Sequence, residues 1–286
     1  MARRPKPMNA ISVVTPSFNQ LPWLRLCAAS VADQQGVEAE HIVQDAGTGA
    51  ELREWAEKNP RVKLFEEKDS GMYDAINRGF RRASGEIFAW LNCDEQYLPG
   101  TLAKVAAWFA AHPGTDVLFG DAVLVDARGA LLSYRRAILP SLLHVKLAHL
   151  NTLSCATFFR RSVIVRGFFL DTQWKTIADG AWVAELLKAR IPMAVIGEPL
   201  SAFAMLENNL GQGEIARDER RRFRESAGAA RRCLRLPAVI LHRARKFLHG
   251  AYAKRSLAVE IYTQHSPERR QRISADNLSF AWKKSA

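Results

Sequence analysis

An acidic pair follows a short apolar run in the first third of the chain. The run is Ile87–Leu91 (IFAWL), and the pair is Asp94 and Glu95. Carboxylate oxygens are hard ligands that suit Mg²⁺ or Mn²⁺, and such ions commonly link a protein carboxylate to phosphate groups. In an open α/β sheet, ligands bind in the crevice outside the carboxyl ends of the strands. The pair therefore indicates a site for a nucleoside diphosphate and a divalent cation.

Other polar groups stand at comparable places, each at or just after a predicted strand. They are Thr15–Asn19, Asp45 and Asp69. Because parallel strands end at the same edge of a sheet, we expect these groups to meet Asp94 there. The loop Thr15–Gln20 contains no glycine, which argues against a dinucleotide-binding dehydrogenase.

Short apolar runs alternate with helical segments through the first half of the chain. This alternation predicts βαβ units and an α/β fold, Rossmann-like, with a mainly parallel sheet and helices on both faces. The predicted strands are Ile11–Pro16, Glu40–Asp45, Val62–Glu66 and Ile87–Leu91, and the predicted helices are Pro22–Asp33, Ala50–Lys58, Tyr73–Ala83 and Leu102–His112.

The second half is less regular. Two short strands joined by a turn at Arg128 and Gly129 predict an antiparallel or mixed region. An irregular segment at Ile138–Asn151, a strand at Cys155–Ser162 and a helix at Ala178–Ile191 follow. Near the C-terminus, Leu257–Thr263 and Leu278–Lys283 predict the two strands of a terminal hairpin.

Charge is distributed unevenly along the 286 residues. From Glu207 onward there are 18 Lys/Arg and 8 Asp/Glu, against 23 and 21 in the first 206 residues. The segment Gly213–His249 is helix-prone and Arg-rich, with a predicted interruption at Pro237. Such a basic tail is typical of contact with an anionic membrane or an acidic partner, or it is a solvated helix face. Without a binding module or interleaved aromatics, it does not favour nucleic acid as a partner.

Composition excludes several classes. No apolar run approaches the roughly 20 residues that span a bilayer. The N-terminus is basic, but Ile11–Phe18 is too short and is interrupted by Pro16, which argues against export. The four cysteines are widely spaced and indicate free thiols in a reducing compartment. We therefore expect a cytoplasmic protein.

The ordered segments SVVTPSFNQ, HIVQDAGTG, KDSGMYDAINRGFRRASGEIFAWLNCDEQYLPGTL, CATFFRRS and IADGAWVAELL resemble bacterial glycosyltransferase family 2. The resemblance covers Ile11–Phe203 in the right order. It implies the GT-A fold in residues 1–206, with residues 207–286 as a basic helical and hairpin extension. It also implies an inverting, metal-dependent transfer from a nucleotide sugar, commonly a UDP-sugar, to a glycan or lipid-linked acceptor.

The resemblance assigns the donor-binding positions. Family members usually carry Tyr where Phe18 stands, and a basic residue where Ser70 stands. Asp45 matches the residue that pairs with the base, although an Asp before Gly47 is also a common turn former. The implied donor-binding residues are Thr15, Pro16, Phe18, Asp45, Asp69, Gly71, Tyr73, Asn77 and Cys93.

The metal motif reads Asn92-Cys93-Asp94-Glu95, where family members commonly have Asp-x-Asp or Asn-x-Asp-Asp. Asp94 occupies the metal position for Mn²⁺ or Mg²⁺, and one carboxylate suffices when phosphate and water supply the other ligands. Glu95 either assists or faces water. Cys93 is expected to pack rather than bind the ion, because a thiolate suits softer metals.

Asp179 matches the family's catalytic base, although an Asp in a first helical turn is also stabilised by the helix dipole. Trp182 is the candidate acceptor platform, or a core aromatic. The family often has His near Leu153–Phe159, and His149 is the candidate substitute.

Two hypotheses follow. The first is a family 2 glycosyltransferase of cell-surface polysaccharide synthesis, docked on the inner face of the cytoplasmic membrane through residues 213–286. The second is a catalytically impaired nucleotide-sugar or glycan binding protein with the same fold, suggested by the altered metal motif and by Ser70.

Overall fold

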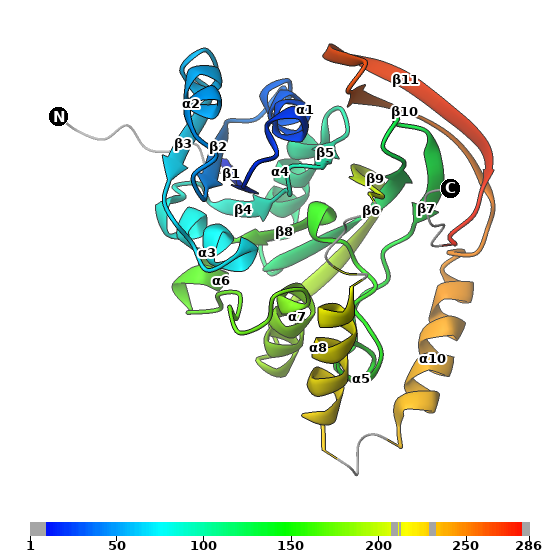
Figure 1. Cartoon of the computed structure of the whole chain (residues 1–286). Helices are drawn as coiled ribbons and strands as arrows, with labels where there is room; N and C mark the ends of the chain where they lie inside the picture. Colours follow the sequence, from blue (N-terminus) through cyan, green and yellow to red (C-terminus); the bar gives the residue numbers. More distant parts are fainter. Residues whose placement is uncertain (1–9, 207–210, 212, 229–232, 282–286) are drawn as a thin grey trace.

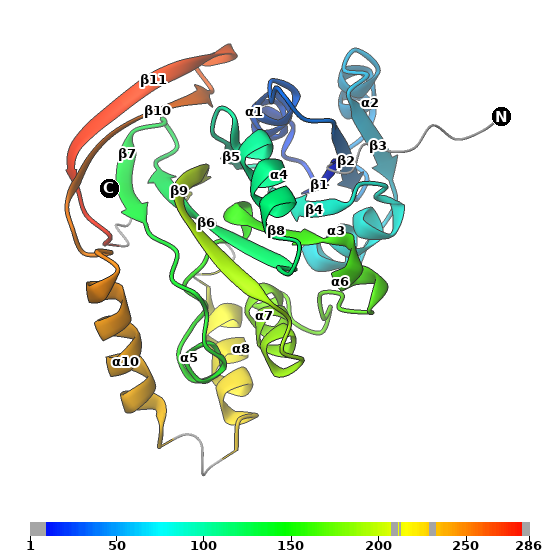
Figure 2. The same cartoon turned by 180° about the vertical axis from the view of Figure 1, so that it is seen from behind.

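The computed structural model describes residues 10–206, 211, 213–228 and 233–281 (Figure 1). Within them, nine strands form one mixed sheet in the order β3-β2-β1-β4-β8-β6-β9-β5, with β7 paired to β6. A separate two-stranded sheet, β10-β11, lies beside β7 (Figures 1 and 2). The predicted α/β fold with a terminal hairpin is confirmed.

One half of the sheet is parallel, and its residues explain why. Every residue of β1 is buried, as expected for a parallel strand covered on both faces. The pairing aligns Ser17 with Asp45 and Asp45 with Glu66, so three strands end at one edge. The elements are β1 (Ile11–Ser17), α1 (Leu21–Ala32), β2 (Ala39–Asp45), α2 (Ala50–Glu57), β3 (Val62–Glu66), α3 (Met72–Arg82) and β4 (Ile87–Trp90).

Helices cover both faces of this half. On one face α3 packs close to β1, because Gly79 has no side chain. A Cβ at Gly79 would lie 2.3 Å from Cγ1 of Val14. This close approach brings the N-terminus of α3 toward the ends of the strands. Residues of α7 join α3 in the same apolar cluster, whereas α1 and α4 contribute to the cluster on the opposite face.

The other half is mixed. Here β8 runs antiparallel to both β4 and β6, whereas β6 and β9 are parallel. Strand β8 is shorter than predicted, because Ser154–Ala156 form a 3₁₀ turn and Arg161 begins a helix. The elements are β5 (Glu95–Tyr97), α4 (Thr101–Ala111), β6 (Val117–Val125), β7 (Leu131–Arg135), α5 (Leu142–Leu147), β8 (Thr157–Arg160), α6 (Arg161–Val165), α7 (Ala178–Lys188) and β9 (Met193–Ala204).

The C-terminal region contains α8 (Glu214–Glu225), α10 (Arg235–Leu248), β10 (Arg255–Thr263) and β11 (Ser266–Leu278). Two predictions about it were wrong. Pro237 lies in the first turn of α10, where its missing N–H costs nothing, so it does not interrupt the helix. The second hairpin strand begins at Ser266 rather than Leu278. Its side chains are mostly exposed and polar, and so show no apolar alternation. Residues 282–283 of the predicted strand lie outside the described residues.

The hairpin is fastened to the body by buried polar contacts. The side chain of Gln96 donates to the backbone oxygen of Tyr262 (2.9 Å) and accepts from its N–H (2.8 Å). Arg270 donates to both carboxylate oxygens of Asp33, at 2.5 and 2.8 Å. Among the described helices, none is both long enough and apolar enough to cross a bilayer.

Candidate active site

A cavity of about 1170 Å³ opens at the carboxyl ends of β1 and β4. Most of its wall comes from the end of β1, the loop between β3 and α3, the segment after β4, the segment 145–154, and the start of α7. Two residues of α8, Arg220 and Phe223, also line it. The C-terminal region therefore contributes directly to the site.

Three of the four acids expected to converge line this cavity. They are Asp69, Asp94 and Asp179. The fourth, Asp45, lies at the end of β2 next to the cavity and is fully buried. Its carboxylate accepts hydrogen bonds from the backbone N–H groups of Gly47 (2.8 Å) and Thr48 (2.6 Å). Asp45 thus orders its own turn, and the neighbouring Ala46 forms part of the cavity wall.

Asp94 follows β4 with a half-buried carboxyl group. Burial raises its pKa to about 6, although a hydrogen bond from its own backbone N–H acts to lower that pKa. A bound cation would offset this penalty, because a nearby opposite charge favours the ionised form. A carboxylate exposed to the cavity, with room beside it for phosphate and water, fits Mg²⁺ or Mn²⁺.

Glu95 points the other way. It has no exposed surface, so the interpretation that it faces water was wrong. Its carboxyl group accepts hydrogen bonds from the N–H of Asn92 (2.7 Å) and the hydroxyl of Ser154 (3.3 Å). Burial, followed by the charge of Asp94, raises its pKa to about 8. Glu95 shapes the loop that presents Asp94.

The loop before α3 is built around Gly71, whose φ of +126° favours glycine. The carboxylate of Asp69 accepts the Gly71 N–H (2.9 Å), and the Ser70 N–H donates to Asp74 (3.0 Å). Gly71 is the N-cap residue of α3, so the positive end of that helix faces the cavity. This is a favourable place for an anion such as phosphate.

Two lysine side chains lie near the loop that contains Ser70. Lys68 lines the cavity one residue before Asp69. The ammonium group of Lys175 donates to the backbone oxygen of Ser70 (2.9 Å). The sequence analysis missed both residues. Lys68 could have been found from its place beside Asp69, whereas Lys175 is 105 positions from its partner.

Asp179 lies in the first turn of α7, on the cavity wall. Burial raises the pKa of its carboxyl group. Hydrogen bonds from the Gly180 N–H (2.8 Å) and the Tyr73 hydroxyl act in the opposite direction. The buried phenol of Tyr73 has a pKa well above its usual range, because of burial and the Asp179 charge, and stays protonated. The pair therefore presents a carboxylate of raised basicity held by a neutral donor.

Helix α8 fixes the segment that leads into α7. The buried carboxylate of Glu219 accepts hydrogen bonds from the backbone N–H groups of Lys175 (2.7 Å) and Thr176 (2.9 Å), and from the Thr176 hydroxyl (2.8 Å). Asp179 follows three residues later. Glu219 is a further residue that the sequence analysis missed, because nothing in an Arg-rich helix marks one of its acids as buried.

Pro16 and Phe18 lie at the end of β1, and Cys93, which follows β4, also lines the cavity. Pro16 and Phe18 line the cavity, and Phe18 is 57% exposed, as a ring available for stacking would be. The Cys93 thiol donates to the backbone oxygen of Pro16 (3.2 Å). Burial raises the pKa of Cys93 well above its usual range. The neutral thiol therefore joins the two strand ends by packing.

Besides Asp45, three predicted residues lie away from the cavity wall. Thr15 is buried and its hydroxyl contacts Nε2 of His41 (2.9 Å). The amide of Asn77 holds the Leu170 backbone through two hydrogen bonds, of 2.7 and 3.0 Å. Trp182 is only 3% exposed and meets Trp90 edge to face, with ring centroids 5.8 Å apart. Its placement is that of a core aromatic, not of an acceptor platform.

Comparisons with known proteins agree with this geometry. The family model described as glycosyl transferase family 2 matches residues 12–162. A PGL/p-HBAD biosynthesis glycosyltransferase of Mycobacterium bovis is 31% identical over 119 residues, which are 40% of this chain and 46% of that protein. The O-antigen biosynthesis protein RfbC of Myxococcus xanthus is 34% identical over 136 residues, 45% of this chain and 10% of that protein. The chain thus matches less than half the length of these curated relatives.

Solved structures resemble the fold over a longer span. Residues 1–349 of S. aureus TarS, in complex with UDP-GlcNAc, match with a TM-score of 0.57 and 16% identity, covering 83% of this chain and 72% of that one. The mannosyltransferase PcManGT from Pyrobaculum calidifontis, in complex with GDP-Man and Mn²⁺, matches with a TM-score of 0.57 and 18% identity, covering 86% and 76%.

Proposed function

The chain belongs to glycosyltransferase family 2 and has the GT-A fold, and on that premise we propose that it moves a sugar from a UDP-sugar to a glycan or lipid-linked acceptor, with inversion, in cell-surface polysaccharide synthesis. The supporting observation is the convergence of Asp69, Asp94 and Asp179 on one cavity. Relatives named for O-antigen and PGL/p-HBAD biosynthesis support the class of product.

The donor is assigned to the β1 and α3 side of the cavity. Phe18 stacks on the base beside Pro16, and Ala46, held by the turn of Asp45, borders it. The N-terminus of α3 and the ammonium group of Lys68 bind the diphosphate. Solved relatives in complex with UDP-GlcNAc and with GDP-Man and Mn²⁺ support a nucleotide-sugar donor.

Asp94 is the proposed ligand of Mn²⁺ or Mg²⁺. When bound, the ion neutralises negative charge on the departing nucleoside diphosphate. The carboxyl group of Glu95 fixes the loop through the Asn92 N–H, which keeps the Asp94 carboxylate toward the cavity. Asp69 holds Gly71 in its left-handed conformation, so that the phosphate-binding end of α3 stays in place.

Asp179 is the proposed catalytic base. It removes the proton of the acceptor hydroxyl, whose oxygen forms a bond to the anomeric carbon on the face opposite the leaving group. The carbon–oxygen bond to the diphosphate breaks, and its electron pair leaves with the nucleoside diphosphate. Burial raises the pKa of Asp179, which makes it a better proton acceptor. The Tyr73 hydroxyl orients the carboxylate.

A donor screen tests this function. Purified full chain is incubated with UDP-, GDP- and dTDP-sugars and Mn²⁺, and release of the nucleoside diphosphate is measured with and without added polysaccharide fragments. We expect release from UDP-sugars that stops when the ion is chelated. Equal and negligible release from every donor, with no change in Tm on adding any of them, would contradict the proposal.

Residues 1–206 are the proposed catalytic domain, and residues 207–286 the extension that closes the cavity and meets the membrane. Helix α10 carries Arg and Lys residues and no acidic residue. Its outer face is apolar, so it fits the boundary of an anionic bilayer, where basic side chains reach the headgroups. The exposed apolar residues are Leu236, Ile240, Leu241, Phe247 and Leu248.

Vesicle co-sedimentation tests this contact. Wild-type protein is expected to sediment with phosphatidylglycerol vesicles, and the double variant Phe247→Ser/Leu248→Ser is expected to remain in the supernatant. Ile215→Ser, an exposed apolar residue on α8, is the matched control and should sediment like the wild type. Equal sedimentation of the double variant and the wild type would exclude α10 as the anchor, and leave the transferase proposal standing.

A further inference from the structure

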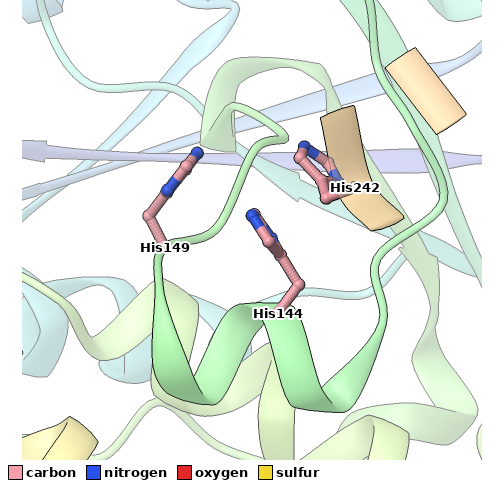
Figure 3. Close-up of side chains that lie close together, drawn as sticks. All are labelled: His144, His149 and His242. Atoms are coloured by element: carbon pink, nitrogen blue, oxygen red, sulfur yellow. The ribbon is translucent and has the colours of Figure 1, made fainter. Parts of the chain in front are cut away.

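Three histidines lie close together beside the cavity wall, which one of them, His149, helps to form. His144 lies in α5, His149 follows that helix, and His242 lies in α10. Figure 3 shows the three side chains close together, although His242 comes from a helix distant in sequence from the other two. One ring nitrogen from each residue lies within 4.8 Å of the others. This cluster takes no part in the proposed transfer.

Two of these rings are buried without the hydrogen bonds that a buried imidazole normally makes. His144 is 1% exposed, and His242 is 5% exposed. Within the described residues, neither Nδ1 nor Nε2 of His144 has a hydrogen-bond partner, and Nε2 of His242 has none. Leaving buried polar groups unpaired destabilises a fold. A ligand that accepts their lone pairs would remove that cost.

The rings are held in the neutral form that metal binding requires. Burial, together with neighbouring positive charges, lowers the pKa of His144 to about 3 and that of His242 to about 4. Burial also lowers the pKa of His149, together with the charges of Lys246, Arg135 and Arg220. A metal ion therefore has no proton to displace from these rings near neutral pH.

Imidazole nitrogens select a different class of ion from the one expected at Asp94. They suit Zn²⁺ and other transition-metal ions, whereas Mg²⁺ prefers oxygen. Zn–N bonds of 2.0–2.1 Å place tetrahedral ligands about 3.3 Å apart. The ring nitrogens lie within 4.8 Å of one another, so binding an ion requires them to approach by up to about 1.5 Å.

The fourth ligand follows from the surroundings. His149 lines the cavity, so an ion held by the three rings faces it. Lys246, Arg245, Arg135 and Arg220 add positive charge around the cluster. A dication in such a place needs a compensating negative charge, so the fourth ligand is expected to be hydroxide or another small anion.

We propose that His144, His149 and His242 form a Zn²⁺-type transition-metal site that ties α10 to α5 at one end of the cavity. The site is separate from the Asp94 site, and it does not depend on the identity of the sugar donor. The alternative is that the three rings simply pack together, as His144 and His242 do with centroids 3.7 Å apart.

Metal titration of the untagged full chain, stripped with a chelator, tests the site. A Cys233→Ser background removes the exposed thiol as a competing ligand. We expect one Zn²⁺ per chain by calorimetry, and the intense visible absorption of four-coordinate Co²⁺, which Zn²⁺ abolishes. His242→Gln should weaken Zn²⁺ binding more than about 100-fold, beyond the 10–100-fold that loss of an outer-shell partner produces.

Two further variants make the result decisive. His149→Gln alters the exposed ligand, so it should lose the Co²⁺ absorption while keeping the wild-type circular dichroism. His249→Gln removes an exposed histidine that follows the same helix as His242 and should bind Zn²⁺ like the wild type. Zn²⁺ should raise the Tm of the wild type and of His249→Gln, but not of His149→Gln. Equal Zn²⁺ affinity in all variants, or no four-coordinate Co²⁺ spectrum in the wild type, would overturn the proposal.

Discussion

The two sides of the cavity are built in different ways. The donor side consists of strand ends and the N-terminus of α3, where backbone groups and nearby side chains such as Asp69 and Gly71 complete each other within a few residues. The extension side depends on long-range contacts, such as Glu219 with Lys175 and Thr176, and His242 with His144. We infer that the donor side keeps its shape by itself, whereas the extension side depends on docking of the C-terminal region.

The largest expected effect is at Asp179, the proposed base, where the two sides meet. Asp179→Asn keeps the size of the side chain but cannot accept the proton, so kcat should fall by about 10³–10⁴-fold. Donor affinity, measured by calorimetry with UDP and Mn²⁺, should stay within about twofold, because Asp179 is proposed to act on the acceptor hydroxyl. A parallel loss of UDP binding would show that the residue belongs to the donor side.

Removal of the metal ligand should affect the donor side only. Asp94→Asn should lower kcat/KM by about 10²–10³-fold, because charge on the leaving group is then poorly stabilised. Excess Mn²⁺ should recover part of the activity, since phosphate and water supply the remaining ligands. Initial rates against Mn²⁺ concentration give the result. If the rate of the variant depends on Mn²⁺ concentration as that of the wild type does, the metal ion does not bind Asp94.

A smaller effect is expected from Lys68, which is proposed to bind the diphosphate. Lys68→Ala should weaken UDP binding by about tenfold, the size of one charge-assisted hydrogen bond. Lys63→Ala is the control, because Lys63 is exposed on β3 and pairs with Glu40 (2.6 Å). Equal UDP affinities of the two variants would show that Lys68 does not bind the phosphate groups.

The extension side is tested at Glu219. Glu219→Ala leaves the N–H groups of Lys175 and Thr176 without their acceptor, so the start of α7 should shift and kcat should fall several-fold to about tenfold. UDP affinity should not change. The measurement is kcat and the UDP dissociation constant of the same preparation. An effect on UDP affinity alone would contradict the separation of the two sides.

The smallest expected effect is on stability. Burial raises the folded-state pKa of Asp179 above its unfolded value, so ionisation of this group destabilises the fold once the pH rises above the unfolded pKa. Asp179→Asn removes that cost. Its Tm should exceed that of the wild type near pH 8, and the difference should shrink toward pH 4. A difference that does not depend on pH would argue against a raised pKa.

Much of the donor side could be predicted from sequence, because alternating strands and helices place polar groups at one edge of a sheet. Asp69 and Asp94 were placed in this way, whereas Asp179 was placed by the family resemblance. For Trp182 the sequence left two alternatives, an acceptor platform and a core aromatic, because its neighbours in sequence do not show which side of α7 faces the cavity. For Asp45 the sequence left two alternatives, a contact with the base of the nucleotide and a role in its own turn. Only the structure shows that its carboxylate accepts hydrogen bonds from the backbone N–H groups of Gly47 and Thr48.

The extension side was not predictable, for a different reason. Glu219 and His242 acquire their environments only when α8 and α10 dock on segments that are tens of residues away in the chain. Helix α8 looks solvated from its charge pattern, and a polar strand such as β11 carries no apolar alternation. Local patterns do not contain such contacts.

The most direct test of the central claim is anomalous diffraction from crystals grown with Mn²⁺ and UDP. The account predicts an ion bound to the Asp94 carboxylate at about 2.1 Å, bridged to the diphosphate, in the cavity that Asp179 also lines. An ion bound away from Asp94, or UDP bound outside that cavity, would contradict it.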